Sequence, residues 1–360
     1  PGILIPGYHQ TTPFWGYNIY EDLKNNTMKN LLKKIINKEN LTEKEVSEIF
    51  ESIIAGNLSP VVAGAFLVAL SMKGESEEEI LGIVKTMRRH MKTLSVEGNI
   101  LDTCGTGGDG LNTINVSTIT AFVCASAGVK VAKHGNRSVS SKCGSFDVLE
   151  SLGVKIDMEK NLTEKCLQEV GIACLFAPLY HPAMKNIVPV RKELGIRTVF
   201  NFVGPLLNPA NASHQLIGVS SKEMAEKLGN ILMRLGSKKV LLVHSDDGLD
   251  EISVAGPTQV FEFVQGSPMK TYKIEPEIIY SLADVQGGEA EENAKIMKDI
   301  LAGNGTDAHN EFIALNAGAA LLTAGVVENF EQGKSRALEL IKSGAGMEKL
   351  EELIKFSNNI

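Results

Sequence analysis

The chain has 360 residues, 43% of them hydrophobic, which is enough apolar material for a large buried core and about two domains. Its formal net charge is −7, so it lacks the overall positive field that attracts nucleic acid or anionic membranes. No apolar run approaches the roughly 20 residues that span a bilayer. With no signal-peptide pattern at the N-terminus, we expect a cytoplasmic protein that binds neither nucleic acid nor membrane.

The five cysteines are odd in number and scattered, and no C-x-x-C spacing occurs. A disulfide framework or a zinc site is therefore not expected. Residues 1–27 are rich in proline, glycine and aromatic residues and contain the only tryptophan, Trp15. We expect them to be an extension or leader ahead of a helical pattern that begins at Met28.

Residues 28–95 carry only helical periodicity. Capping-box pairs occur at Thr42 with Glu45 and at Ser76 with Glu79, and Ser59-Pro60 is a further helix start. The pattern predicts a small helical domain. Its helices carry more apolar surface than so short a segment can bury, so we expect a homodimer formed through this domain.

Residues 96–360 alternate short apolar runs with helical stretches, which is typical of an α/β domain with a mainly parallel sheet. The expected strands are Ile100–Thr103, Val129–Lys133, Ala173–Phe176, Leu216–Val219, Lys239–His244 and Gln259–Phe263. Expected helices include Thr118–Ala127, Ser145–Leu152 and Lys222–Leu235, followed by Ala290–Leu301, Glu311–Ala324 and Phe330–Ser343 in a helical tail. Ligands of such sheets bind at the carboxyl ends of the strands.

The stretch Asp102–Thr118 holds four glycines within six residues, with Asp109 among them and polar residues after them. Glycines let backbone N–H groups approach a ligand closely, so the stretch predicts a phosphate-binding loop. It also matches G-x-G-x-x-G, the dinucleotide fingerprint. That interpretation fails because the helix starts too late and the region about 20 residues further on is basic, where an acidic residue is needed.

Two further stretches can hold anions and a cation. Lys133–Ser141 combines two cations, three serines, an asparagine and a glycine, which predicts a second phosphate cradle. Ser245–Ser253 holds four carboxylates within six residues without EF-hand spacing. Beside phosphate loops, such carboxylates favour Mg²⁺ bound jointly with a phosphorylated substrate. Without a Walker lysine motif, the set fits a substrate carrying pyrophosphate rather than ATP hydrolysis.

Taken in order, GTGGD, KHGNRSVSS, HPAMK, VRKELGIRT, FNFVGPLLNPA and DGLDEIS resemble the anthranilate phosphoribosyltransferase family from about Met28 to Phe356. The resemblance implies a small helical domain, a large α/β domain of the nucleoside phosphorylase type, a homodimer, and a hinge near residues 181–205. It implies transfer of the 5-phosphoribosyl group of phosphoribosyl pyrophosphate (PRPP) to anthranilate, a step of tryptophan biosynthesis, with two Mg²⁺ ions.

The same resemblance implies residue roles. PRPP would be bound by Gly105, Gly107, Gly108, Asp109, Thr113, Asn115, Val116, Ser117, Thr118, Lys133, His134, Gly135, Asn136, Arg137, Ser138, Val139, Ser140, Ser141 and Ser145. Anthranilate would be bound by Gly105, His134, Asn136, His181 and Arg191. Ser117 would help to hold one Mg²⁺, and Asp250 with Glu251 would hold the other.

Catalysis is expected to come from electrostatics and positioning, because the difficult step is breaking the bond to pyrophosphate, and no residue is assigned as a dedicated acid or base. Two rival functions remain. One is a pyrimidine nucleoside phosphorylase-like enzyme; the other is a non-catalytic nucleic-acid-binding relative, which the negative net charge opposes. Association with a glutamine amidotransferase is left open by the sequence.

Overall fold

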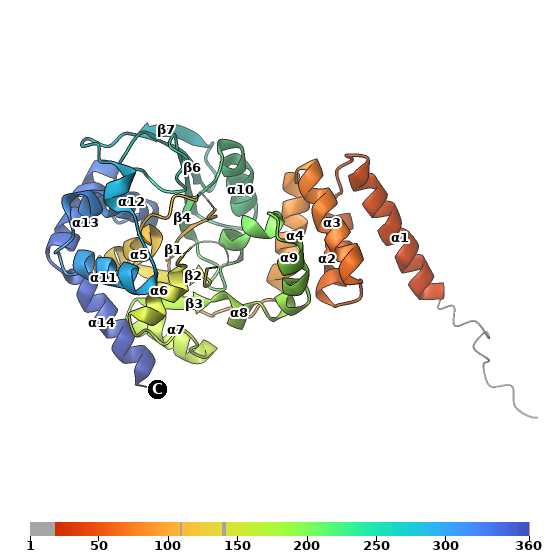
Figure 1. Cartoon of the computed structure of the whole chain (residues 1–360), viewed down its shortest axis with the longest axis horizontal. Coiled ribbons are helices and arrows are strands. Elements are labelled where there is room, and N and C mark those ends of the chain that lie inside the picture. The colour runs from red at the N-terminus through yellow and green to blue at the C-terminus, as the bar shows by residue number, and fades with distance from the viewer. Residues whose placement is uncertain (1–18, 109, 139–141, 360) are drawn as a thin grey trace, which may run out of the picture.

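The computed structural model describes residues 19–108, 110–138 and 142–359. It has a helical region at one end and a larger α/β body at the other (Figure 1). Within the described residues no helix is both long and apolar enough to cross a bilayer. The helical region starts with four helices in chain order, α1 (Ile19–Ile36), α2 (Glu43–Ile54), α3 (Pro60–Lys73) and α4 (Glu77–His90).

The predicted helix starts in this region are confirmed. Thr42 and Glu45 form a reciprocal capping box ahead of α2, and Ser76 and Glu79 form one ahead of α4. Glu79 does more than cap, because its fully buried carboxylate also accepts from Lys73 Nζ at 2.8 Å and from the backbone N–H of Leu41 at 2.9 Å. This charged contact fastens the start of α4 to the end of α3.

The first helix begins earlier than predicted. α1 starts at Ile19, inside the segment that was expected to be an extension, rather than at Met28. Proline, glycine and aromatic content made the whole of residues 1–27 look irregular, although Ile19–Thr27 contains neither of the strong helix breakers, glycine and proline.

The α/β body is built on a seven-stranded sheet in the order β3-β2-β1-β4-β5-β6-β7. The first five strands in that order are parallel, and β6 and β7 add antiparallel pairs at one edge. The strands are β1 (Ile100–Gly105), β2 (Lys130–Gly135), β3 (Ile172–Phe176), β4 (His214–Gly218), β5 (Lys239–Ser245), β6 (Thr258–Val264) and β7 (Lys270–Ile274). The predicted α/β class and mainly parallel sheet are confirmed.

Two buried apolar clusters lie in the molecule. The first includes residues of β1–β3 and of helices on that side of the body. These helices are α5 (Val116–Ser126), α6 (Ser145–Ser151), α7 (Lys160–Glu169), α11 (Ala290–Leu301), α12 (Asp307–Ala324), α13 (Phe330–Lys342) and α14 (Ala345–Asn358). The second joins the helical region to α10 (Lys222–Arg234) and to side chains of β4–β6. The helical region is therefore packed continuously onto the body along α4 and α10, whose exposed Glu78 and Arg234 pair at 2.6 Å.

The chain returns to the helical region after β3. A short helix α8 (Ala177–Tyr180) and the 3₁₀ turn η1 (Pro182–Asn186) lead into α9 (Val188–Leu194), which lies beside α3 (Figure 1). Ile187 and Val190 are buried with residues of the helical region. Two more 3₁₀ turns, η2 (Val199–Asn201) and η3 (Gly204–Leu207), then bring the chain back to β4, and η4 (Leu282–Val285) precedes α11. Part of the predicted hinge segment thus packs with the helical region.

Candidate active site

The carboxyl ends of the five parallel strands share one edge of the sheet, where ligands of such folds bind. The sequence motifs follow the strands in spatial order across this edge: His181 after β3, Lys133–Ser138 at the end of β2, the glycine-rich loop after β1, and Asp250 after β5. β1 and β2 each run two residues further than predicted, to Gly105 and Gly135. The extension brings the first residues of both motifs onto the sheet edge itself.

The glycine-rich loop has the backbone that its composition predicts. Gly107, Gly108 and Gly110 have φ angles of 69°, 83° and 73°, in the left-handed region that favours glycine. The N–H of Gly107 donates to Asp250 Oδ2 at 2.7 Å, which joins this loop to the loop after β5. Asp109, predicted to bind PRPP, lies outside the described residues.

Glycines at the ends of β1 and β4 allow the loop that carries Asp250 to approach the glycine-rich loop. A Cβ on Gly105 would overlap the carboxylate of Asp250, and one on Gly218, at the end of β4, would overlap the backbone carbonyl oxygen of Asp250. Both positions therefore require glycine for close approach rather than for backbone freedom. The segment that carries Asp250 crosses directly over the ends of β1 and β4.

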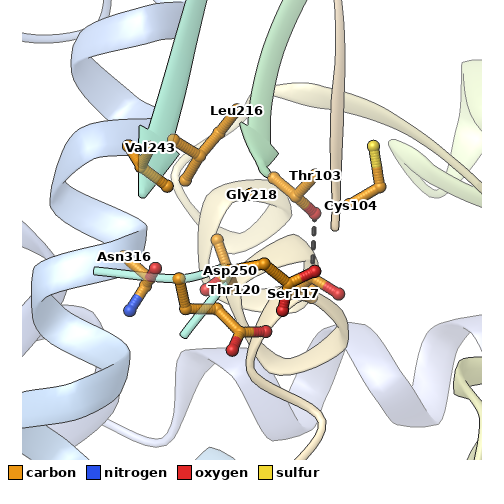
Figure 2. A pocket seen from close by; sticks show the side chains of 10 residues that line it. Thr103, Cys104, Ser117, Thr120, Leu216, Gly218, Val243, Asp250 and Asn316 are labelled. Atoms are coloured by element: carbon orange, nitrogen blue, oxygen red, sulfur yellow. Dashed lines mark hydrogen bonds between the residues drawn. The ribbon is translucent and has the colours of Figure 1, made fainter. Parts of the chain in front are cut away.

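Oxygen-bearing side chains line a small pocket under these strand ends (Figure 2). They come from Thr103 on β1, Ser117 and Thr120 on α5, Asp250 and Glu251 after β5, and Asn316 on α12. The hydroxyl of Thr103 donates to the backbone carbonyl of Ser117 at 2.8 Å, which fixes the first turn of α5 against β1. Hydroxyl and carboxylate oxygens are the ligands that Mg²⁺ prefers. Because the described residues contain no group of three metal-binding His, Cys, Asp or Glu side chains, other ligands would have to complete its shell.

Lys133 was predicted to contact phosphate, and its ammonium group points into the protein instead. It is 1% exposed and donates to the carbonyl of Thr103 at 2.9 Å and to Ser117 Oγ at 3.2 Å. Burial lowers the pKa of this lysine, and the nearby carboxylate of Asp102 acts in the opposite direction. Lys133 therefore reaches the predicted phosphate site through Ser117.

Asp102 lies in the predicted strand Ile100–Thr103, and the sequence assigns it no role. It is fully buried, and its oxygens accept from the backbone N–H of His134 at 3.3 Å and from Asn208 Nδ2 at 2.7 Å. Burial raises the pKa of this carboxyl to about 6, against the opposing effect of Lys133. Asp102 and Lys133 are two buried ionisable groups beneath the site that influence each other electrostatically, which the sequence pattern did not reveal.

The loop after β2 is organised by the start of α6. Arg137 pairs with Glu150 through two contacts of 2.7 Å, and the backbone N–H groups of Ser138 and Gly144 both donate to Asp147 Oδ2 at 2.8 Å. The Ser145 hydroxyl lies 3.4 Å from the carbonyl of Asn136. Val139, Ser140 and Ser141, also predicted to bind PRPP, lie outside the described residues.

The polar segment before α5 is held by residues far along the chain. Thr113 forms an isolated antiparallel bridge with Gln286, and the N–H of Ile114 donates to the carbonyl of Val285 at 3.1 Å. Asn293 on α11 donates to the side chain of Asn115 at 3.1 Å. Val116, Ser117 and Thr118 then form the first turn of α5, with Val116 and Thr118 buried.

His134 and His181 meet at the β2–β3 end of the edge. Their Nε2 atoms are 3.2 Å apart, and both rings are buried. Burial lowers the pKa of His134 to about 3, helped by His181 and Lys133, and lowers the pKa of His181 to about 4. Both rings are therefore neutral at physiological pH.

Arg191 lies on α9, in the part of the chain that packs with the helical region. Its guanidinium stacks on the ring of Phe200, 4.8 Å from the centroid, and burial lowers its pKa. The side chain is thus held by an aromatic face and not by an ion pair with a carboxylate among the described residues. A neighbouring arginine that was given no role, Arg197, donates to the carbonyls of Gly107 and Gly108 in the glycine-rich loop.

Comparison with known proteins shows which class of enzyme the two parts of the chain resemble. Residues 29–91 match the helical bundle domain of a glycosyl transferase family, and residues 97–347 match the α/β domain of the same family. The two matches together cover most of the chain. The predicted division into a helical and an α/β part agrees with these ranges in kind, and the domain limits at residues 27 and 95 stay predictions.

The chain belongs to the anthranilate phosphoribosyltransferase family. It is 47% identical to the enzyme of that name from Desulfatibacillum aliphaticivorans over 332 residues, covering 91% of this chain and 98% of the relative. The structure is similar to the Thermus thermophilus enzyme, with 40% identity, a TM-score of 0.84, and coverage of 91% of this chain and 99% of that one. It is also similar to the Saccharomyces cerevisiae enzyme in complex with PRPP and Mg, with 28% identity, a TM-score of 0.85 and coverage of 93% and 99%.

Proposed function

We propose that this protein transfers the 5-phosphoribosyl group of PRPP to the amine of anthranilate, giving N-(5′-phosphoribosyl)anthranilate and pyrophosphate. The observation that carries the proposal is the order of groups along one sheet edge. A backbone loop and oxygen donors suited to a charged pyrophosphate lie at β1, β4 and β5, and a neutral histidine pair lies at β2 and β3. Membership of the family supports this assignment of the two ends.

PRPP would bind at the glycine-rich end. The left-handed glycines of the loop present backbone N–H groups, and the first turn of α5, with Ser117, adds a helix N-terminus that favours phosphate. The segment from Lys133 to Ser145 would close over the phosphates from the β2 side. In this arrangement Lys133 would not contact PRPP directly. It would hold Ser117 by a hydrogen bond and place a buried positive charge beneath the anion.

Mg²⁺ fits the donor set at this end. Ser117 would help to hold one ion, and Asp250 with Glu251 would hold a second, each shell being completed by oxygens of PRPP and water. When bound, Mg²⁺ neutralises the charge that develops on the leaving pyrophosphate. The N–H of Gly107 keeps the Asp250 carboxylate turned toward the loop at which pyrophosphate would lie.

Anthranilate would bind at the other end, with Arg191 facing its carboxylate and Gly105, His134, Asn136 and His181 along its route. A neutral imidazole carries one ring N–H. The His134 ring also hydrogen-bonds to the backbone of Gly204, and the His181 ring to that of Leu207. These backbone contacts compete with the Nε2–Nε2 contact for the single N–H of each ring, so which ring donates in that contact depends on the tautomers.

The chemistry then follows from placement. The bond from C1′ to pyrophosphate breaks with its electron pair on the leaving group, and the lone pair of the arylamine forms the new C1′–N bond. The nitrogen then loses one proton, to water or to the departing pyrophosphate. A neutral histidine pair suits this nucleophile, because a charged imidazolium would repel the positive charge that develops on the ribosyl carbon. The step needs orientation and charge stabilisation more than a strong base.

The test is an assay of the purified full chain with anthranilate, PRPP and Mg²⁺, followed by the loss of anthranilate fluorescence. Consumption of anthranilate that requires both PRPP and Mg²⁺ is expected. Turnover that is unchanged by a metal chelator would contradict the metal proposal alone. Absence of turnover in the complete mixture, with the protein shown to be folded, would contradict the proposed function.

The same mixture separates the nearest rival. A pyrimidine nucleoside phosphorylase would release a base from uridine or thymidine with inorganic phosphate and would leave anthranilate unchanged. We expect no base release, because in the proposed site Arg191, stacked on Phe200, would bind the carboxylate of an aromatic substrate.

We also propose a homodimer formed through the helical region. Val61 and Met72 on α3 are 80% and 81% exposed, and Ile36 on α1 is 64% exposed. Large apolar side chains exposed on the helical region favour an interface between copies. Sedimentation at micromolar concentration should show a dimer, and Met72→Glu should shift it toward the monomer. A monomeric wild-type protein would exclude the proposal.

A further inference from the structure

A guanidinium group outside the predicted binding residues contacts the phosphate loop directly. Arg197 Nη1 donates to the carbonyl of Gly108 at 3.0 Å, and Nη2 donates to that of Gly107 at 3.2 Å. We propose that Arg197 is a positioning residue that fixes these two peptide groups and thereby sets the affinity of the loop for PRPP. This inference rests on the proposed function and adds to it a residue with no predicted role.

Peptide geometry gives the contact its effect. The peptide bond is planar and trans, so the carbonyl of one residue and the N–H of the next point to opposite sides. Holding the carbonyl of Gly107 on the Arg197 side therefore turns the N–H of Gly108 to the other side. Gly107 and Gly108 both have positive φ angles. Because glycine has no side chain to limit its conformation, the backbone of these two residues could adopt many other conformations. The guanidinium of Arg197, which donates to both carbonyl groups, restricts this conformational freedom.

The arginine itself is held in place from the helical region. Its backbone carbonyl accepts from Ser71 Oγ on α3 at 3.3 Å, and the helix just before it, α9, packs on α3. The next residue, Thr198, is buried and donates its N–H to the side chain of Asn201 at 3.0 Å. The loop is thus fastened to a part of the chain that lies outside the sheet.

Charge makes the arrangement suitable for an anion. The hydrogen-bond acceptors of Arg197 on the described chain are neutral carbonyl oxygens, and none of the ion pairs between described residues involves it. Its positive charge therefore remains beside the loop and adds to the attraction for pyrophosphate. Fit is close as well, because a Cβ on Gly108 would overlap Nη1 of Arg197.

The first experiment compares Arg197→Ala with the wild type in the anthranilate and PRPP assay. We expect the KM for PRPP to rise at least about tenfold, since hydrogen bonds that involve a charged group are individually strong. The KM for anthranilate should stay within about twofold. Arg197→Lys, which can donate to the loop from one point only, should fall between the two. Lys192→Ala, an exposed cation on α9, is the matched control and should match the wild type.

A second variant tests the contact itself. Gly108→Ala should displace the guanidinium, so adding Arg197→Ala to it should raise the KM for PRPP less than about twofold further. Independent, multiplying effects would show that Arg197 acts elsewhere and would overturn the inference. So would an unchanged KM for PRPP in a folded Arg197→Ala protein. Wild-type turnover, measured alongside, separates this failure from a failure of the proposed function.

Discussion

The two ends of the candidate site differ in the charge and chemistry of their side chains. At the β1, β4 and β5 end, the groups are oxygen donors and backbone N–H groups, with a buried lysine behind them. At the β2 and β3 end, two imidazoles are kept neutral by burial. The anthranilate carboxylate is proposed to meet Arg191, which lies on α9 against the ring of Phe200. The first end suits a multiply charged leaving group, and the second suits a flat, weakly basic amine with one carboxylate.

The contrast shows how one sheet edge can hold two dissimilar reactants without a dedicated acid or base. Charged groups lie at the end where the pyrophosphate leaving group would bind, and the histidines at the end where the amine would bind are uncharged. Asp102 touches both ends, since it accepts from the backbone of His134 and lies near Lys133. Changes at each end should therefore have separable effects, and a change at the Asp102–Lys133 pair should affect both.

Lys133→Met should produce the largest effect. It leaves the Asp102 carboxylate buried without its positive neighbour, so the free energy of unfolding should fall by about 3 kcal/mol. Chemical denaturation measures the change. Lys130→Met on the same strand is the control, because that ammonium is exposed on the surface and should matter by less than about 0.5 kcal/mol. Equal losses in the two variants would remove the special role of Lys133.

Asp250→Asn should act on the charged end alone. We expect kcat to fall at least about tenfold, or roughly 1.4 kcal/mol, and its dependence on Mg²⁺ concentration to change. Glu251→Gln should behave similarly. Asp246→Asn, in the same acidic segment but paired with Lys273 at the surface, is the matched control. If Asp250→Asn and Glu251→Gln both keep normal turnover and normal Mg²⁺ dependence, the metal assignment is wrong.

Arg191→Ala should act on the other end. The KM for anthranilate should rise about tenfold, because a charge-assisted contact to its carboxylate is lost, and the KM for PRPP should stay nearly constant. Steady-state kinetics with each substrate varied in turn measures both. A rise in the PRPP constant alone would move Arg191 to the phosphate side of the site.

His181→Asn should show its effect in the pH dependence of stability. The pKa of His181 is lowered from 6.5 to about 4, so the neutral ring favours folding above pH 6.5 and this contribution is lost as the pH falls toward 4. Unfolding free energies measured from pH 7 to 4 should therefore fall less steeply in the variant. Asp102 shifts in the opposite direction, but it is common to both proteins. Parallel curves would mean that the ring is solvated.

The sequence predicts well what is local. The capping boxes at Thr42 and Ser76 involve residues three apart in the sequence. The glycine content of the loop likewise predicts the positive φ angles that its backbone adopts. The edge strand β7 was missed because KTYKI is short and mostly exposed, with Ile274 its one fully buried residue. α14 was not separated from the helical tail.

Interactions between distant segments could not be predicted in this way. Arg197 meets Gly107 across 90 residues, and Asp102 meets Asn208 across 106. Lys133 is predicted to contact phosphate because its neighbours in KHGNR are polar and basic, yet its ammonium group is buried beneath the sheet edge. A single sequence shows which residues can bind phosphate but not which way their side chains turn.

The bare ends of β1 and β4 have a consequence for mutational mapping of this site. An alanine scan reports what is lost when a side chain is removed, but at Gly105 and Gly218 alanine adds an atom where Asp250 passes. Such variants would lose activity with every functional side chain still present. In a saturation library, positions 105 and 218 should therefore reject all replacements equally, whereas position 250 should rank its replacements by chemistry. That difference in tolerance profile would separate steric from chemical constraint without any structure.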